Sequence, residues 1–353
     1  MAAELKTVTI CDPQQADPRV LEFLYAAKPS MPALAAEKWV WRYVRSPAGK
    51  GTISLIVDEA RQDRIVAHNA LARCRIAVKG ELITVGRSGG QRVEQDYRSR
   101  GLLLKLRSLE DRVARSQGVP LITALPNRVS TPGCLLTGYR FHQHFAIATG
   151  ASRLLRRGAL RRPVPAVKQA GLYLVGRLVR DRSKLPPPDD LRIDEVDGFG
   201  EPVDRLWERL ARRGYLGICK DSTHLNWRYL SRPDTTVFAF LASVGNTPRA
   251  LCIIEKYNSS PASGWVAELL AGPEDEHIAL EVLRQAQDHV ARLGVRTLKA
   301  LIDGVSVTGS VVQRLGYVTT AVRPFMIRPL DREVSEKMAG PWQHSMGDFM
   351  TGS

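Results

Sequence analysis

The sequence predicts an α/β (α+β) fold carried twice, with a mixed, mostly antiparallel sheet flanked by helices in each copy. Its 353 residues are too many for one ordinary hydrophobic core and suit two domains. The segment Trp41-Arg42-Tyr43 recurs 186 residues later as Trp227-Arg228-Tyr229, and Gly138-Tyr139 recurs as Gly316-Tyr317. Both repeats hold the same place in a common order of elements, which indicates a duplicated chain.

The elements of the first copy follow from hydrophobic periodicity and turn residues. A helix is expected to begin near Pro18, because proline suits the first helical position. Leucines at helical spacing predict a long helix over 101–117 that ends at Gly118. Lys79-Gly80 predicts a turn between two strands. The expected strands are 52–58, 65–78, 82–93, 119–125 and one after Gly138, with a short helix over 130–137.

The second copy repeats this order of elements. In both copies, antiparallel strands lead into a strand, helix, strand crossover, which predicts a mixed sheet. The expected helices lie near 201–213, 222–231, 274–293 and 306–315, and the expected strands near 236–244, 249–257, 264–271, 295–301 and from Tyr317.

These elements divide the chain into four parts. We expect a first domain over 1–150, a basic connector over 151–188, a second domain over 189–330 and a loosely ordered tail over 331–353. The connector holds ten basic residues and one acidic residue between Arg153 and Lys184, within a chain whose formal net charge is +15. Residues 166–182 have the pattern of an amphipathic helix, which either packs on the domains or, through 153–184, contacts an anionic membrane.

The composition excludes several classes of protein. Hydrophobic residues make up 44% and charged residues 25% of the chain, as in ordinary globular domains. No apolar run approaches the roughly 18 residues that cross a bilayer, and a secretory leader pattern is missing, so we expect a cytoplasmic protein. The five cysteines lack zinc-site spacing, which predicts reduced thiols and no metal. A nucleic-acid partner is not expected, because no recognition motif is evident.

An anion site is predicted at 93–103, where a strand gives way to a helix. A helix start offers N–H groups without intrahelical partners and the positive end of the helix dipole, which suits phosphate. Arg98 and Arg100 add positive charge, and Gly101 lets a ligand approach the backbone. The same junction of the second copy, 274–276, carries three acids that would repel phosphate. Only the first copy is therefore expected to bind such an anion.

This stretch resembles motif A of the GNAT (GCN5-related N-acetyltransferase) superfamily, written (Arg/Gln)-x-x-Gly-x-(Gly/Ala). Arg98 and Gly101 match, whereas Leu103 stands where Gly or Ala is usual. The order of surrounding elements also resembles the superfamily, in its tandem-domain bacterial type. The resemblance implies acetyl-CoA, or another acyl-CoA, as cosubstrate, with main-chain amides on its pyrophosphate and a splayed strand beside its pantetheine arm. The implied binding residues are Val93, Arg98, Ser99, Arg100, Gly101, Leu102, Leu103 and Asn127.

The sequence does not identify a catalytic acid or base. Many GNAT relatives use a Glu on the splayed strand and a Tyr in the short helix, but here the strand reads Gly-Arg-Ser-Gly-Gly over 86–90 and Cys134 replaces the tyrosine. Cys134 is a proton donor, a nucleophile that becomes acylated, or a small buried core residue. Glu94, His142 and His144 lie near the expected cleft and are further candidates. The repeated Trp-Arg-Tyr segment is most simply an aromatic anchor whose arginine caps or pairs.

The sequence therefore predicts an N-acyltransferase that moves an acetyl or other acyl group from CoA to an unidentified amine. The acceptor is a small molecule or an envelope precursor, and its identity, like the oligomeric state, is left open. One alternative is a Fem-like or acyl-carrier-dependent transferase that takes its acyl group from aminoacyl-tRNA or from acyl carrier protein. Another is a non-catalytic scaffold that senses CoA.

Overall fold

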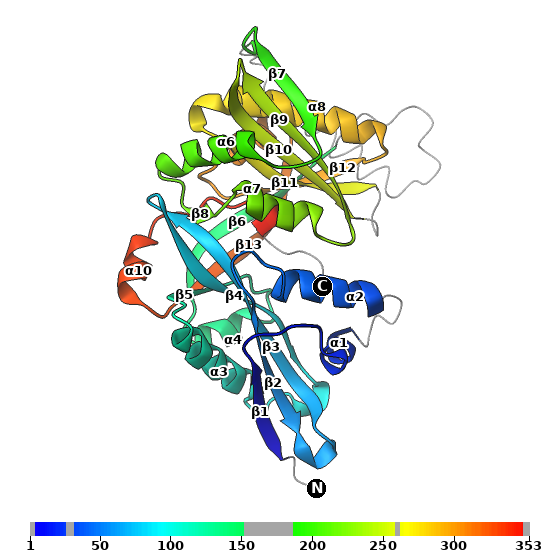
Figure 1. The fold of residues 1–353 in the computed structure, drawn as a ribbon, viewed down its shortest axis with the longest axis vertical. Helices are drawn as coiled ribbons and strands as arrows, with labels where there is room; N and C mark the ends of the chain where they lie inside the picture. Colours follow the sequence, from blue (N-terminus) through cyan, green and yellow to red (C-terminus); the bar gives the residue numbers. More distant parts are fainter. Residues whose placement is uncertain (1–3, 26–31, 152–185, 258–261, 349–353) are drawn as a thin grey trace.

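The computed structural model describes residues 4–25, 32–151, 186–257 and 262–348. The amphipathic helix predicted over 166–182 and the membrane contact predicted through 153–184 lie outside the described residues. The predicted mixed, mostly antiparallel sheet flanked by helices is confirmed (Figure 1).

The first half holds the predicted elements with small shifts at their ends, and an additional edge strand, β1, that the sequence analysis missed. Helices α1 and α2 cover one face of its strands, and α3 and α4 cover the other (Figure 1). Lys79 and Gly80 both have positive φ angles, of 50° and 85°, as the predicted tight turn requires. The elements are β1 (Leu5–Ile10), α1 (Pro18–Tyr25), α2 (Pro32–Tyr43), β2 (Thr52–Asp58), β3 (Arg64–Val78), β4 (Glu81–Val93), α3 (Leu102–Ser116), β5 (Leu121–Ala124), α4 (Thr131–Leu136) and β6 (Arg140–Ala151).

The second half repeats this order and again has more strands than predicted, namely β7 and the short β8. Its predicted helix near 222–231 is an α-helical turn, α7, followed by a π-helical turn, η3. The elements are β7 (Leu191–Val196), α6 (Glu201–Arg212), β8 (Gly217–Ile218), α7 (Ser222–Leu225), η3 (Asn226–Leu230), β9 (Thr235–Val244), β10 (Thr247–Tyr257), β11 (Ser263–Ala271), α8 (Glu276–Arg292), β12 (Thr297–Ile302), α9 (Val307–Arg314), β13 (Val318–Pro329), α10 (Arg332–Lys337) and η5 (Met346–Asp348).

The two halves exchange their last strands. The strand order is β1-β2-β3-β4-β5-β13-β6-β12-β11-β10-β9-β7, with β8 against β3. Strand β13 pairs with β5 of the first half, β6 pairs with β12 of the second half, and β6 and β13 pair with each other in the centre. One continuous sheet therefore joins the halves through main-chain hydrogen bonds.

The repeated aromatic segments form a second connection between the halves. The indoles of Trp41 and Trp227 stack at 5.0 Å, and each donates its Nε1–H to the backbone carbonyl of the other, at 2.8 and 3.0 Å. The interpretation as an aromatic anchor is confirmed, with the addition that it anchors one copy to the other. The reciprocal bonds mark a pseudo-twofold relation between the copies.

The segment after Leu330 is structured as far as residue 348, so the predicted loose tail is wrong for this stretch. Met338, Trp342 and Met346 are buried against strands of both halves, and Trp342 is 1% exposed. Their spacing of four residues is a hydrophobic periodicity that could have revealed the packing from the sequence. We call residues 342–348 the C-terminal segment.

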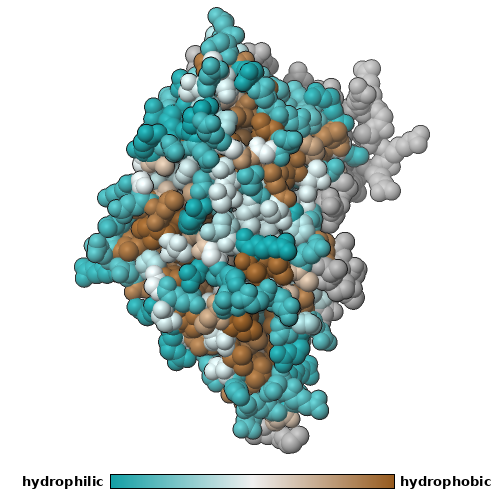
Figure 2. Space-filling model, viewed as in Figure 1, coloured by the Kyte–Doolittle hydropathy of each residue, from teal (hydrophilic) through white to brown (hydrophobic). Residues whose placement is uncertain are grey.

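None of the helices among the described residues is long and apolar enough to cross a membrane. Figure 2 shows separate hydrophobic patches divided by hydrophilic residues on one face of the molecule.

Candidate active site

A cavity of about 480 Å³ lies where β4 and β5 separate. The two parallel strands pair only at Gly86 with Ile122 and at Arg87 with Thr123, and β4 then continues alone beside β3 to Val93. Because the main-chain groups of a strand point alternately to its two sides, those of β4 beyond Arg87 that face away from β3 are available to a ligand. The splayed strand implied by the sequence resemblance is confirmed.

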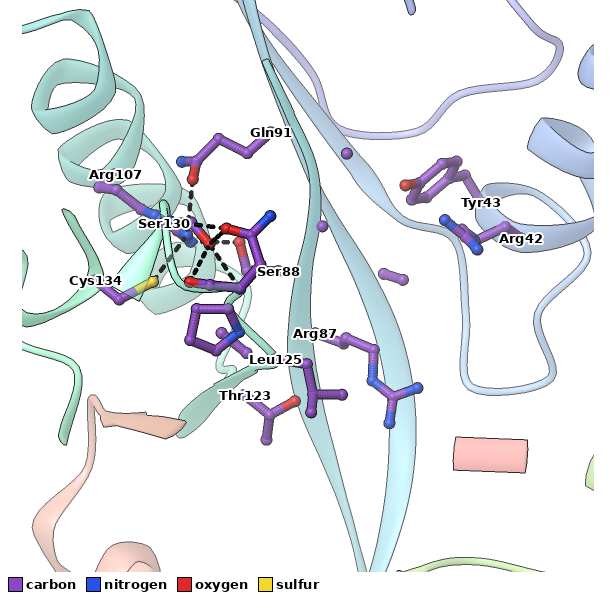
Figure 3. A pocket seen from close by; sticks show the side chains of 16 residues that line it. Arg42, Tyr43, Arg87, Ser88, Gln91, Arg107, Thr123, Leu125, Ser130 and Cys134 are labelled. Carbon is purple, nitrogen blue, oxygen red and sulfur yellow. Dashed lines mark hydrogen bonds between the residues drawn. The ribbon is translucent and has the colours of Figure 1, made fainter. Parts of the chain in front are cut away.

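Buried polar side chains form the wall of the cavity on the α3 face. Arg107, 4% exposed, donates to Glu110 at 2.8 Å, to the Tyr139 hydroxyl at 2.9 Å and to Ser88 of β4. Its other nitrogen donates to Gln91 at 3.2 Å and approaches the Cys134 sulfur at 3.7 Å (Figure 3). These contacts fix the arginine, so the wall is rigid and polar.

Burial sets the protonation states of this wall. Burial raises the pKa of the Cys134 thiol above its ordinary value, although the Arg107 charge acts in the opposite direction. Burial also raises the pKa of Tyr139 well above its ordinary range. At neutral pH, Cys134 is therefore a thiol, which can donate a proton but is a poor nucleophile.

On the α2 face, the cavity is lined by Arg42 and Tyr43. Figure 3 shows both side chains across β4 from Arg107 and Cys134. The guanidinium of Arg42 lies 5.9 Å from the ring centre of Tyr43. His68 of β3 is fully buried behind this wall and donates from Nδ1 to the Gly90 carbonyl at 2.7 Å, as its neutral form allows, since burial lowers its pKa to about 4. The cavity thus opens toward both faces of the sheet.

The predicted anion loop lies at the start of α3, on the same face as Arg107. Gly101 is the N-cap, with φ +71°, and residues 98–101 are exposed. Ser99 also has a positive φ, of 62°, and the Arg100 guanidinium lies over the Tyr97 ring at 5.0 Å. Because glycine has no side chain to cap the helix, the first amides of α3 remain available to a ligand.

Of the other predicted binding residues, only Asn127 lines the cavity. Val93 ends β4, and its carbonyl accepts from Arg98 at 3.4 Å. Leu102 is buried, Leu103 is half-buried beside Gly133, and neither lines the cavity. Asn127 does line it, but its Oδ1 accepts the N–H groups of Val129 at 3.0 Å and Ser130 at 2.9 Å in the turn before α4. Its binding role stays a prediction.

Among the candidate catalytic residues, only Cys134 lines the cavity. Glu94 pairs with Arg64 on the surface, and His144 is exposed against Phe141. His142 contacts the Gly340 carbonyl at 3.1 Å. Of the described residues that line the cavity, none is a carboxylate or a histidine, so none of them is a general base of the usual kind.

The second half has the same splayed strands, but the C-terminal segment fills the space between them. The N–H of His344 bonds to Asp303 at 2.7 Å, and the Gly347 carbonyl accepts from Arg228 at 2.7 Å. A side chain at Gly347 would collide with Tyr229 and Glu268. The cavity that described residues line at this place measures about 20 Å³. The prediction that the second copy does not bind CoA gains a steric reason.

Several side chains of the site were missed by the sequence analysis. Arg107 and Glu110 have the i, i+3 spacing of a surface ion pair and are polar residues in an amphipathic helix. The available signal was that both fall on the leucine-rich side of α3, because Leu103, Leu106 and Leu109 alternate with them. A buried arginine in a helix that borders a predicted cleft indicates that its side chain lines a binding site.

Comparisons with known proteins show which solved structures have a similar fold. No protein-family model matches the sequence, and neither does any curated protein. Among solved structures, a GCN5-related N-acetyltransferase from Anabaena variabilis superposes with a TM-score of 0.61 at 10% identity, covering 92% of this chain and 73% of that one. A probable N-acyltransferase from Enterococcus faecalis gives 0.61 at 10%, covering 93% and 73%. A tandem GNAT protein from the clavulanic acid biosynthesis pathway gives 0.58 at 14%, covering 96% and 100%.

Proposed function

We propose that this chain, whose fold is the tandem GNAT fold, is an N-acyltransferase that uses acyl-CoA. The observation that carries the proposal is the cavity at the separation of β4 and β5, which is lined by Arg107 of α3, a helix whose N-terminus is capped by glycine and preceded by two arginines. The structural neighbours support acyl transfer in general. Acetyl-CoA as the donor and an amine as the acceptor are part of the proposal.

The residues present fit such a donor. The exposed loop 98–101 and the first α3 amides suit a pyrophosphate, and the unpaired edge of β4 suits an extended arm that carries amides. When bound, acyl-CoA supplies a thioester carbonyl. The amine nitrogen forms a bond to that carbonyl carbon, the C–S bond breaks, and the amine loses a proton while the thiolate gains one. In this proposal Cys134, which lines the cavity, gives its thiol proton to the departing sulfur, and the proton that leaves the amine restores the Cys134 thiol.

Replacing Gly101 by valine is expected to abolish binding of acetyl-CoA. A β-branched residue at φ +71° costs about 1–2 kcal/mol and places methyl groups against the amides. The measurement is the rise in melting temperature caused by acetyl-CoA. Gly118→Val is the matched control, because Gly118 ends the same helix with φ +65° and also has open space around its Cβ position. Protection that survives in Gly101→Val would move the donor site elsewhere.

The pH dependence of turnover is expected to follow the acceptor and not an enzyme carboxylate. The reacting amine must be neutral, and no described residue lining the cavity is a carboxylate or a histidine. At limiting acceptor, kcat/KM should therefore rise with pH up to the pKa of the amine itself. Two acceptors of different amine pKa should give profiles displaced by that difference. A common inflection for both acceptors would reveal an enzyme base.

A further inference from the structure

The second copy of the fold shows what the arginine of the repeated segment binds. Arg42 and Arg228 are the matching arginines of the Trp-Arg-Tyr repeat. The sheet register also matches Ala72 with Glu255. In the first copy, Ala72 of β3 pairs with Arg87 of β4, and Arg87 is the last residue of β4 that pairs with β5. In the second copy, Glu255 of β10 pairs with Trp265 of β11, and Trp265 is the last residue of β11 that pairs with β12. The two environments can therefore be compared position by position.

In the second copy, the chain itself supplies oxygen partners to this arginine. Arg228 donates to the Glu255 carboxylate at 3.4 Å and to the Gly347 carbonyl at 2.7 Å, and it is 1% exposed. In the first copy, the position of Glu255 is taken by Ala72, which lines the open cavity. Glu268, on the splayed strand β11, likewise corresponds to Gly89 in the glycine-rich stretch of β4. Glu268 pairs with Ile253 of β10, and Gly89 pairs with Ala70, the matching residue of β3.

Two carboxylates of the second copy are thus replaced by small residues in the first, and empty volume takes their place. The described residues that line this volume include Arg42, Arg87 and Arg107, and none of them is acidic. Arg107 is neutralised by Glu110, whereas Arg87 donates to the Asp348 carbonyl. An adjoining cavity of about 250 Å³ on the α2 side shares Arg42 and adds Lys38, which pairs with Asp234, and Arg92, which donates to the Leu24 carbonyl. The acceptor route is therefore lined by basic side chains.

We propose that the acceptor amine carries an anionic oxygen group, a carboxylate or a phosphate, which binds to Arg42 as Glu255 and Gly347 bind to Arg228. The inference rests on the proposed function and names its acceptor class. The donor reaches the cavity from the α3 face, where loop 98–101 lies, so the α2 face is left for the acceptor. Polyamines are expected to be poor acceptors, because a second cationic group would meet Arg42 in a cavity whose described lining residues include no carboxylate.

The first test compares acceptors that differ only in this group. The pairs are L-phenylalanine with L-phenylalaninamide, and glucosamine 6-phosphate with glucosamine, with spermidine as a polycation, all at equal concentrations of free amine. We expect the anionic member of at least one pair to have a kcat/KM about 10- to 100-fold higher, the range of a charge-assisted hydrogen bond. The preferred pair distinguishes carboxylate from phosphate. A preference for the neutral members or for spermidine would overturn the proposal.

The second test changes the charge at the proposed site. Ala72→Glu places in the first copy the carboxylate that Glu255 supplies in the second, so KM for the anionic acceptor should rise at least about 10-fold. Ala72→Gln is the matched control of the same size and should raise KM less. Arg42→Gln should remove the preference between the members of a pair, whereas Arg45→Gln, on the exposed Arg45 three residues later, should keep it. If Ala72→Glu and Ala72→Gln raise KM equally, both act by filling space, and the proposal that charge governs acceptor binding is overturned.

Binding measurements separate this inference from the proposed function. Ligand-detected NMR with the same pairs, without acyl-CoA, reports whether the anionic member binds and whether Arg42→Gln weakens it. Anion binding that depends on Arg42, without turnover, would keep the anion site and overturn acyl transfer. Protection by acetyl-CoA together with turnover of neutral amines would keep acyl transfer and overturn the inference.

Discussion

Replacing Lys220 by methionine is expected to destabilise the protein by about 3–5 kcal/mol at pH 7, the cost of removing one partner from a buried ionic cluster. Lys220 is fully buried between β8 and α7. Its ammonium donates to Glu268 at 2.7 Å, to Ser345 at 2.9 Å and to Asp348. Without it, two carboxylates stay buried with no cation between them. Urea denaturation gives the free energy of unfolding.

The sign of the pH dependence follows from the carboxyl groups. Burial alone would raise the pKa of Asp348, but the Lys220 charge brings it below its ordinary value, so its contribution to stability is present above pH about 4 and is lost as the pH falls. Burial holds the pKa of Glu268 above its ordinary value even beside Lys220. In Lys220→Met, burial raises the pKa of both carboxyl groups, although His344 beside Asp348 and Tyr229 beside Glu268 still oppose it. The destabilisation should therefore be larger at pH 7 than at pH 4.

A surface pair gives the control for this cluster. Arg205 and Glu201 form an i, i+4 pair in α6 whose side chains are 52% and 79% exposed. Arg205→Met should therefore change the free energy of unfolding by no more than about 0.5 kcal/mol. A similarly small loss in Lys220→Met would show that the C-terminal segment is not held by this cluster.

Local patterns predicted most of the elements, because periodicity and turn residues act within a few positions. Helix α3 and the turn at Lys79-Gly80 are examples: one follows from leucine spacing, and the other from residues that tolerate positive φ. The exchange of β6 and β13 could not be predicted in this way. The apolar pattern of a strand indicates that it pairs, but not which partner it pairs with, and both exchanged strands have equivalent places available in either half.

The candidate site was predictable where ligand contacts come from the backbone, and less predictable where they depend on which side chains line the cavity. Gly101 pointed to the helix start because glycine has a distinct backbone role there. The cavity is open because Ala72 has a small side chain and Gly89 has none. Their effect is recognised only by comparison with Glu255 and Glu268, which hold the matching positions of the second copy. The stretch 86–90 lacks the Glu that many relatives carry there, and in the structure Gly89 has no atom within 4 Å of its Cβ position, which leaves room in the cavity.

Filling this room should abolish turnover without unfolding the protein. Gly89→Trp is expected to lower kcat/KM at least about 100-fold, because the indole would occupy the cavity in which donor and acceptor must meet. The backbone tolerates the change, since Gly89 has an ordinary φ and no atom lies within 4 Å of its Cβ position. The melting temperature without ligand should therefore stay close to that of the parent protein.

Gly198→Trp is the matched control for this variant. Gly198 is exposed before α6, also has an ordinary φ and has no atom within 4 Å of its Cβ position. It should keep full turnover, which separates the effect of the cavity from that of an added indole. In Gly89→Trp, the fluorescence of the indole should be insensitive to added acetyl-CoA if the side chain excludes the acyl end. A folded Gly89→Trp protein that still transfers the acyl group at the parent rate would place the reaction outside the cavity between β4 and β5, and the proposed function would lose the observation on which it depends.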